Sequence, residues 1–360
     1  MKNIILIDGI IFNLQNGAHH GISRVWKCLL EQIAKSDLAE DIILLDRNET
    51  APKISGIRRR AVPAHNYSRS ESDPLSVNHW PQDENAALFI STYYTWARDT
   101  PSLLMIHDMI PEVLEFDLMQ PQWRAKKNAI NNSIGILCVS NSSAADLSRF
   151  YPDIDKSKII ITPNAVGDEI QWTTKQLSLN FRRKFNIYKN YFLVVGHRNL
   201  YKNTSLFLKS FIKLPNRNDL EILFVGGAPT LEPELATLIQ GLNWKLMRLS
   251  DSDLSAAYSS AIALVYPSRY EGFGLPILEA QKCRCPVITC HNSSLHEVAG
   301  SAALYVNDVK EFEMVEALMK IQNPSVREFL ANEGSLNIKR FSWEKTGETL
   351  VKALKYFRDT

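Results

Sequence analysis

Short apolar runs recur along the chain in two successive series, and stretches with helical periodicity separate most of them. A run that is apolar at every position indicates a strand buried on both faces, as in parallel sheets covered by helices. Two such series in 360 residues predict two doubly wound α/β domains. The expected strands are 4–7, 42–45, 87–90, 103–106 and 135–139 in the first series, and 192–195, 221–225, 263–266 and 286–289 in the second.

The end of the first series sets the predicted domain boundary. Residues 159–166 have the pattern of its last strand and turn, so the first domain is expected over 1–166. An interdomain connection over 167–189 then leads to a second domain over 190–344. The remaining residues, 345–360, are expected to form a helix that packs back on the first domain.

Composition excludes several classes of protein. The formal net charge of +2 argues against nucleic acid as the main partner. Five scattered cysteines fit neither a disulfide framework nor a common zinc spacing, which favours a reducing compartment. Asp8 interrupts the first apolar run, so the N-terminus is interpreted as a strand and not a signal peptide. No apolar run approaches the roughly 20 residues needed to span a bilayer, and the sequence predicts a cytoplasmic protein.

Three polar segments are expected at the surface. Residues 66–86, rich in Ser, Asn, Asp and Pro, are expected to form a loop-like insertion, and the basic run 58–60 a solvated loop. The basic and aromatic stretch 123–127 is expected to be a solvated helix face. Peripheral contact of that stretch with anionic lipid at the inner face of a membrane is the alternative.

The segment 261–280 carries the chemistry that is easiest to interpret. An apolar strand pattern ends at Pro267 and is followed by a turn containing Gly272 and Gly274, which opens into an apolar helical pattern. Two carboxylates, Glu271 and Glu279, flank that turn with seven residues between them. Ligands of open α/β sheets bind outside the carboxyl ends of the strands, and a helix N-terminus there favours an anion.

The string from Tyr270 to Ala280 resembles the Glu-x7-Glu signature of the family 4 retaining glycosyltransferases. These enzymes have the GT-B fold, in which two Rossmann-like domains face each other across a cleft. The resemblance implies that Glu271 meets the hydroxyls of the donor sugar and that Glu279 holds the ribose of the nucleotide. It also implies that the intervening loop approaches the sugar and the diphosphate, through Gly272, Phe273, Gly274 and Leu275.

Other segments extend the resemblance to most of the chain. Gly21 lies in a loop that the family places by the donor diphosphate, and His107 ends a strand where the family has a histidine against the donor sugar. Lys202 matches the lysine that neutralises the leaving diphosphate. The arginine of that element is out of register, so either His197 or Arg198 occupies its place, and Arg198 is expected to supply the second cation. Arg248 and Leu249 match the loop beside the base.

Two Asp-x-Asp patterns, 153–155 and 251–253, occur in the chain, and this pattern holds the metal ion of metal-dependent glycosyltransferases. Each precedes a polar or helical stretch and does not end a buried strand, so both are expected to be turns or helix caps. His19 and His20 are expected to be exposed loop residues. The sequence therefore predicts no metal and no cofactor beyond the nucleotide sugar itself.

The resulting hypothesis is a metal-independent retaining glycosyltransferase. It would move a sugar from a nucleoside diphosphate, with UDP favoured, to a hydroxyl of a glycan or lipid-linked acceptor, with a role in polysaccharide biosynthesis. Two alternatives stay open. One is another GT-B enzyme, either a nucleotide-sugar epimerase or a glycosyl phosphorylase. The other is a degenerate, non-catalytic partner that binds a nucleotide sugar.

Overall fold

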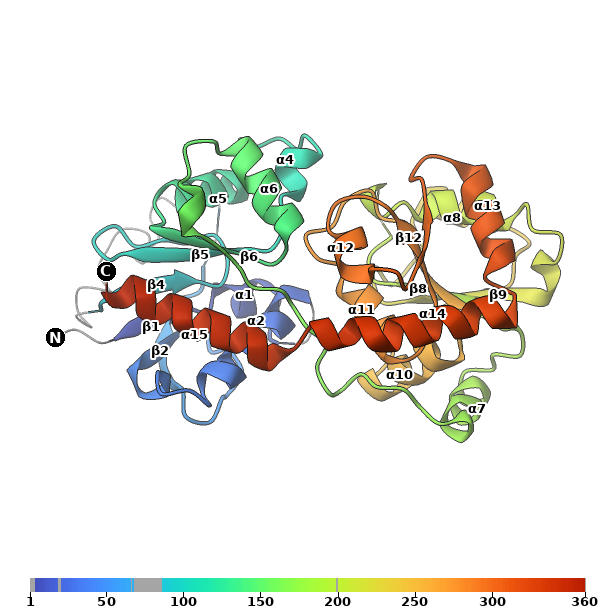
Figure 1. The fold of residues 1–360 in the computed structure, drawn as a ribbon, viewed down its shortest axis with the longest axis horizontal. Coiled ribbons are helices and arrows are strands. Elements are labelled where there is room, and N and C mark those ends of the chain that lie inside the picture. The colour runs from blue at the N-terminus through green and yellow to red at the C-terminus, as the bar shows by residue number, and fades with distance from the viewer. Residues whose placement is uncertain (1–3, 19–20, 66, 68–85, 199, 360) are drawn as a thin grey trace. The chain divides into compact units, whose positions relative to one another are not determined.

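The computed structural model describes residues 4–18, 21–65, 67, 86–198 and 200–359. They form two compact units, of which unit 1 is Met1–Asn164 together with Ser342–Thr360, and unit 2 is Ala165–Phe341. Figure 1 shows that each unit is a sheet with helices packed on it. The expected loop at 66–86 lies almost entirely outside the described residues, as do His19 and His20.

Unit 1 is built on a seven-stranded sheet in the order β3-β2-β1-β4-β5-β6-β7, and every pairing in it is parallel. Five of the strands are buried along their whole length, because helices cover both faces of the sheet. The strands are β1 (Ile5–Asp8), β2 (Ile42–Arg47), β3 (Arg58–Val62), β4 (Leu88–Ser91), β5 (Ser102–Ile106), β6 (Gly135–Cys138) and β7 (Ile159–Ile161).

The helices of unit 1 include one from the far end of the sequence. Helix α15 packs against α2, and Gly347 permits the contact because a Cβ there would lie 2.4 Å from Gln32 Cβ. Ion pairs join Lys355 to Asp37 at 2.6 Å and Arg358 to Asp41 at 3.1 Å. The helices are α1 (Ile10–Leu14), α2 (Gly21–Ile33), α4 (Ile110–Val113), α5 (Pro121–Asn131), α6 (Asn141–Phe150) and α15 (Trp343–Asp359), with 3₁₀ turns at Ala39–Asp41 and Lys156–Lys158.

Unit 2 contains a six-stranded parallel sheet in the order β10-β9-β8-β11-β12-β13. The order reverses between β8 and β11, which makes this the switch point of the sheet, and the loops after these two strands flank it. The strands are β8 (Asn190–Val195), β9 (Leu220–Val225), β10 (Trp244–Met247), β11 (Ala263–Tyr266), β12 (Val287–Cys290) and β13 (Leu304–Val306).

The helices of unit 2 begin inside the segment expected to connect the domains. Helix α7 packs against α10, and Lys184 of α7 pairs with Asp253 of α10 at 2.8 Å. The helices are α7 (Lys175–Lys184), α8 (Thr204–Phe211), α9 (Pro233–Leu238), α10 (Asp251–Ser260), α11 (Leu275–Lys282), α12 (Leu295–Ala299), α13 (Glu311–Lys320) and α14 (Pro324–Asn337), with 3₁₀ turns at Leu200–Lys202, Arg217–Asp219 and Ile338–Arg340.

The predicted fold class and the predicted strands are confirmed, with bounds that differ by a residue or two. Three further strands, β3, β10 and β13, were not predicted, and all three lie at the edge of a sheet. The expectation that residues 58–60 form a solvated loop is wrong, because they belong to β3. An edge strand tolerates charged side chains, and here Arg59 pairs with Asp46 while Arg58 Nη2 donates to the Glu40 carbonyl at 2.6 Å.

The basic stretch of α5 is a solvated face in part. Arg124 and Lys127 are exposed, but Lys126 is completely buried, with Nζ 2.6 Å from Glu112 Oε2 and 3.0 Å from the Asp108 carbonyl oxygen. Thus one of the three cations of the stretch faces inward and stabilises the segment after β5.

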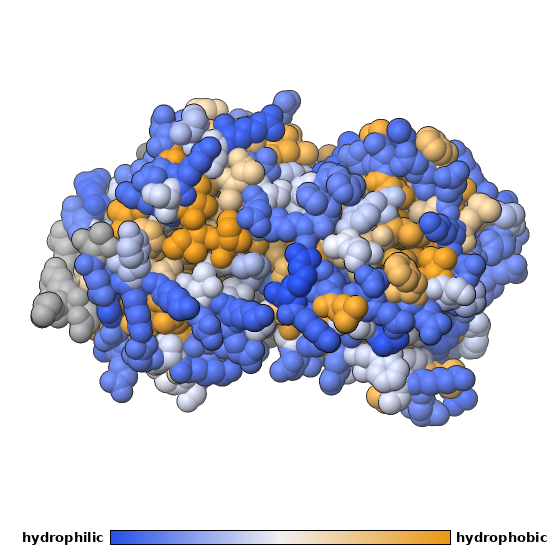
Figure 2. Space-filling view, in the orientation of Figure 1, coloured by the Kyte–Doolittle hydropathy of each residue, from blue (hydrophilic) through white to orange (hydrophobic). Residues whose placement is uncertain are grey.

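Within the described part of the chain, no helix is long and apolar enough to cross a membrane. On the face shown in Figure 2, apolar residues are interspersed among hydrophilic ones.

Candidate functional site

The loops that follow β8 and β11 bring Lys202 and Glu271 together. Lys202 Nζ lies 2.6 Å from Glu271 Oε1 and donates a 3.3 Å hydrogen bond to Tyr266 Oη. The two charged side chains are largely buried, with 16% and 9% of their surfaces exposed. Because the loops flank the switch point of the sheet, the ion pair lies where an α/β sheet binds a ligand.

Lys202 carries a full positive charge in this setting. Burial alone would lower the pKa of Lys202, because it disfavours the charged form. The Glu271 carboxylate, helped by Tyr266 and Tyr201, outweighs burial and raises the pKa of Lys202 above its ordinary value. Burial and the same carboxylate raise the pKa of Tyr266, so its hydroxyl stays protonated. Lys202 is therefore a fixed cation at physiological pH.

The loop after Glu271 is held by two serines of the loop that follows β12. The Glu271 amide donates to Ser293 Oγ at 3.0 Å, and Ser294 Oγ donates to the carbonyls of Glu271 and Phe273 at 2.9 and 2.8 Å. Gly274 has a φ of 103°, a left-handed conformation that favours glycine, and α11 begins at the next residue. Loop shape and helix start are thus fixed before any ligand arrives.

Glu279 lies in the second turn of α11 and is held by a buried tyrosine. Tyr258 Oη donates a 2.8 Å hydrogen bond to Glu279 Oε2. Burial, and then the Glu279 carboxylate, raise the pKa of Tyr258 well above its ordinary value, so the hydroxyl remains a donor. The bond fixes one carboxylate oxygen of Glu279 in place.

Arg198 lies after β8, but its guanidinium braces another loop of unit 2. Nη1 donates to the Gly226 carbonyl at 2.7 Å, and Nη2 donates to the carbonyls of Ala228 and Thr230 at 2.9 and 3.1 Å. Nε lies 3.2 Å from Glu232 Oε2, and 1% of the Arg198 side chain is exposed. These contacts hold the segment between β9 and α9, and a diphosphate would have to displace them to engage the guanidinium.

The braced segment lies beside the residues expected at the nucleotide base. The Gly226 amide donates to the Met247 carbonyl at 3.0 Å, and Met247 ends β10. Arg248, which is exposed, and Leu249, which is half-buried, follow at the carboxyl end of that strand. His197, the alternative to Arg198, is exposed. Lys202 is thus the one cation of the expected set that the structure places against Glu271.

The remaining predicted site residues belong to unit 1. Gly21 has a φ of 47° and opens α2, whose Ser23 amide donates to Gln15 Oε1 at 2.9 Å. His107 follows β5 and is buried, with 6% of its surface exposed. Trp26 Nε1 of α2 donates to His107 Nε2 at 3.3 Å, which joins the predicted glycine helix to the predicted histidine loop.

His107 is a neutral imidazole in the folded chain. Burial lowers its pKa to about 3, and a hydrogen bond to the backbone of Thr92 offsets a part of that effect. Since Nε2 accepts from Trp26, the ring proton is on Nδ1. His107 therefore contributes no charge to a diphosphate site at neutral pH.

The buried histidine predicts a pH dependence of stability. The pKa of His107 is lower in the folded chain than in the unfolded chain, so the unfolded state binds the extra proton and stability falls as pH drops below about 6.5. Between pH 7.5 and pH 5, the loss from this group is expected to be about 2 kcal/mol. Urea unfolding at several pH values measures it, and His107→Asn is expected to flatten that part of the profile. An identical pH profile for the variant and the parent would contradict a neutral, buried His107.

The two Asp-x-Asp patterns are a turn and a helix cap, as predicted. Asp155 Oδ1 accepts from the Ser157 amide at 2.9 Å. In the second pattern, the Asp253 amide donates to Ser250 Oγ at the start of α10, and the Asp253 carboxylate pairs with Lys184. Among the residues that the structure describes, no group of three or more His, Cys, Asp or Glu side chains is placed to hold a metal ion.

Comparison with known proteins relates this geometry to characterised chains. Residues 178–321 match the family described as glycosyl transferases group 1. O-antigen chain mannosyltransferase B from Escherichia coli is 29% identical over 255 residues, which cover 68% of this chain and 66% of the relative. O-antigen chain mannosyltransferase RfbU from Salmonella typhimurium is 29% identical over 247 residues, covering 66% and 65%. The chain thus spans slightly less than two thirds of the length of each.

Solved structures match nearly the whole chain. A sucrose-phosphate synthase from Thermosynechococcus elongatus superposes with a TM-score of 0.78 at 18% identity, covering 99% of both chains. HepE from Anabaena, in complex with UDP and glucose, gives a TM-score of 0.74 at 14% identity and covers 99% of this chain and 100% of HepE. WaaG, described as a glycosyltransferase of lipopolysaccharide biosynthesis, gives 0.75 at 14% identity. The fold is GT-B.

The structural match covers nearly the whole chain, whereas the family match covers residues 178–321. The matched residues 178–321 include Lys202, Glu271 and Glu279, whereas Gly21 and His107 lie outside them.

Two residues that position the site were not selected from the sequence: Tyr258, which holds Glu279, and Trp26, which holds His107. Each is an aromatic residue on a helix, and the residue that it contacts is far away in sequence. Such a pairing becomes visible when the fold is known.

Proposed function

We propose that the chain is a glycosyltransferase that transfers a sugar from a nucleoside diphosphate to a hydroxyl of a saccharide or lipid-linked acceptor. The observation that carries the proposal is the buried Lys202–Glu271 pair, which lies at the switch point of a sheet within the part matched to glycosyl transferases group 1. One member supplies the positive charge that a diphosphate requires. The other supplies the carboxylate oxygens that bind sugar hydroxyls.

The proposed reaction retains the configuration of the anomeric carbon. The acceptor oxygen bonds to that carbon on the face from which the diphosphate leaves, and the acceptor proton passes to the leaving phosphate oxygen. Lys202 stabilises the negative charge that builds on the diphosphate as the glycosidic bond breaks. Glu271 orients the sugar, Glu279 holds the ribose, and Arg198 keeps the loop beside the base in shape. Inversion, seen in the anomeric NMR signals of the product, would rule this course out.

The transferred sugar, the acceptor, the nucleotide and the metal requirement are each proposed on separate grounds. The names of the relatives from Escherichia coli and Salmonella typhimurium make mannose the first candidate for the transferred sugar and an O-antigen glycan the first candidate acceptor. UDP is proposed as the nucleotide from the resemblance of the Glu271 segment to family 4 enzymes. Metal independence is proposed because both Asp-x-Asp patterns are engaged as a turn and a cap.

Calorimetric titration with UDP, GDP and ADP and with their hexose conjugates tests the proposal, first in excess chelator and then with added Mg²⁺ or Mn²⁺. One nucleoside diphosphate is expected to bind with micromolar affinity in chelator. Glu279→Ala is expected to weaken it by about tenfold or more, since tenfold is the lower end of the loss of a hydrogen bond to a charged group. Glu348, an exposed carboxylate of α15 in unit 1, provides the matched Glu→Ala control.

Other results would move the proposal to a different class. Binding that appears only with added metal would refute metal independence. Turnover of a nucleotide sugar without acceptor would identify an epimerase, and dependence on free phosphate would identify a phosphorylase. Binding without turnover across acceptors would indicate a non-catalytic partner. No binding of any nucleotide would overturn the proposed function itself.

A further inference from the structure

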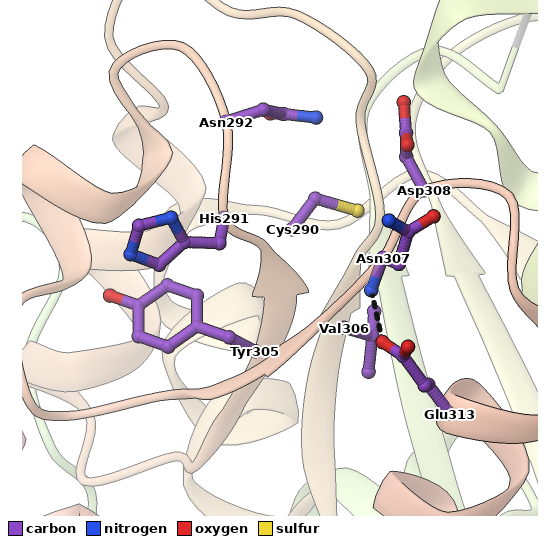
Figure 3. Close-up of a pocket in the computed structure, with 8 residues that line it drawn as sticks. All are labelled: Cys290, His291, Asn292, Tyr305, Val306, Asn307, Asp308 and Glu313. Atoms are coloured by element: carbon purple, nitrogen blue, oxygen red, sulfur yellow. Dashed lines mark hydrogen bonds between the residues drawn. The ribbon is translucent and has the colours of Figure 1, made fainter.

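A cavity of about 270 Å³ lies at the carboxyl ends of β12 and β13, the two strands beyond the Glu271 loop. Figure 3 shows Asn292 on one side of it and Asn307 and Asp308 on the other, with the Cys290 thiol between them. Drug-sized ligands need about 300–1,000 Å³. The cavity therefore suits a single ring and is too small for a whole nucleotide.

Both sides of the cavity are tied to the Lys202–Glu271 pair. On one side, Ser293 follows Asn292 in the chain and its Oγ accepts from the Glu271 amide at 3.0 Å. On the other side, Asn203 follows Lys202 and its Nδ2 donates to the Asp308 carbonyl at 2.7 Å. These two hydrogen bonds place the cavity next to the loops that carry Glu271 and Lys202.

The cavity wall offers hydrogen-bond donors and acceptors together. The Asn292 amide nitrogen points over Cys290, and the Asn307 amide nitrogen faces the same space from the opposite side (Figure 3). Asp308 adds carboxylate oxygens. Glu313 also lines the cavity, but its Oε1 pairs with Lys310 Nζ at 3.1 Å and its Oε2 accepts from the backbone amide of Asn307 at 2.8 Å. A hydroxyl group is both donor and acceptor, so a polyhydroxylated ring matches this mixture.

The same wall disfavours charged ligands. An anion would face the Asp308 carboxylate, since the charge of Glu313 is paired with Lys310. A bare cation would meet amide donors and a thiol beside those oxygens. Burial, and then Asp308, raise the pKa of the Cys290 thiol to about 12, so the floor stays uncharged. The hydrogen-bonding pattern and the charge together favour a neutral ring.

We infer that this cavity is the subsite that receives the hydroxyls of a neutral hexose on the donor and rejects hexuronic acids. The inference rests on the proposed function and names a determinant of donor choice that lies outside the Glu271–Glu279 segment. Asn292 and Asn307 donate to sugar hydroxyls, and Asp308 accepts from them and repels a sugar carboxylate. All three are specificity residues and take no part in bond making.

The test compares UDP, UDP-glucose and UDP-glucuronic acid as probes, or GDP, GDP-mannose and GDP-mannuronic acid if GDP is the nucleotide bound. Asn292→Ala is expected to weaken binding of the hexose conjugate by about three- to tenfold, the loss of one hydrogen bond, and to change the affinity for the free nucleotide by less than about twofold. Asp308→Asn is expected to improve the ratio of uronic acid to hexose affinity by about fivefold or more. Asp219→Asn, at the amino end of β9 on the same sheet, is the control and should leave this ratio unchanged.

The outcomes separate this inference from the proposed function. A parent that binds no nucleoside diphosphate would overturn the proposed function and the inference with it. A parent that binds nucleotide and hexose conjugate, with Asn292→Ala and Asp308→Asn behaving as the parent, would overturn the subsite alone. Variants that change the acceptor KM and leave donor affinity intact would also overturn it, because the cavity would then hold the acceptor. Thermal melting of each variant shows whether it is folded.

Discussion

Lys202→Met is expected to lower kcat by about 10²- to 10³-fold at saturating donor, the cost of removing one fixed group that stabilises developing charge. The ammonium of Lys202 is held 2.6 Å from Glu271 Oε1 and lies where an α/β sheet binds its ligand, so its charge is fixed in position. Glu271→Gln is expected to cause a loss of similar size, because an amide replaces the carboxylate that orients the sugar. Single-turnover kinetics with the donor identified by titration measures both losses.

A second ion pair in unit 2 provides the matched control. Lys213 and Glu311 are 2.5 Å apart, and both are more exposed than Lys202 and Glu271. Lys213→Met and Glu311→Gln remove the same groups away from the switch point and are expected to leave kcat within about twofold of the parent, because exposed ion pairs contribute little. If Lys202→Met reduced turnover no more than Lys213→Met does, Lys202 would have no role in the chemistry.

The sequence predicts the central strands and the residues at their ends, for a physical reason. A strand buried on both faces must be apolar along its whole length, as β1, β4 and β5 are, and this pattern is visible without a structure. The residue that follows such a strand is then placed at the ligand edge by topology alone. His107 and the Glu271 loop follow such strands, and the family resemblance adds the roles expected for them.

Edge strands and side-chain directions could not be predicted in the same way. Strand β3 begins with three arginines, since an edge strand needs no continuous apolar run. Lys126 follows Arg124 by two positions, yet Lys126 is buried against Glu112 whereas Arg124 is exposed. Arg198 lies at the expected place after β8, but its guanidinium is taken up by carbonyls of the segment after β9. Both inward directions depend on partners far away in sequence.

Arg47→Met is expected to reduce the free energy of unfolding of unit 1 by about 3–5 kcal/mol, the typical cost of leaving one member of a buried ion pair without its partner. Arg47 Nε and Nη2 donate to the two carboxylate oxygens of Asp8 at 2.7 and 2.9 Å, and 2% and 0% of the two side chains are exposed. Urea-dependent hydrogen exchange of peptides from β1 and β4 localises the loss to unit 1.

The double variant Asp8→Leu/Arg47→Met decides how this ion pair contributes. Burying two charges costs about as much as their attraction returns, so replacing both with apolar side chains is expected to recover most of the loss caused by Arg47→Met. The Thr95 hydroxyl, which donates to Asp8 Oδ2, retains Ser91 Oγ as a partner at 2.7 Å and is not left unsatisfied. Lys355→Met removes the cation of the exposed pair with Asp37 and is expected to cost less than about 1 kcal/mol. If the double variant were as unstable as Arg47→Met, the bidentate pair would itself contribute net stability. The loss caused by Arg47→Met would then not come from leaving the Asp8 carboxylate buried without a cation.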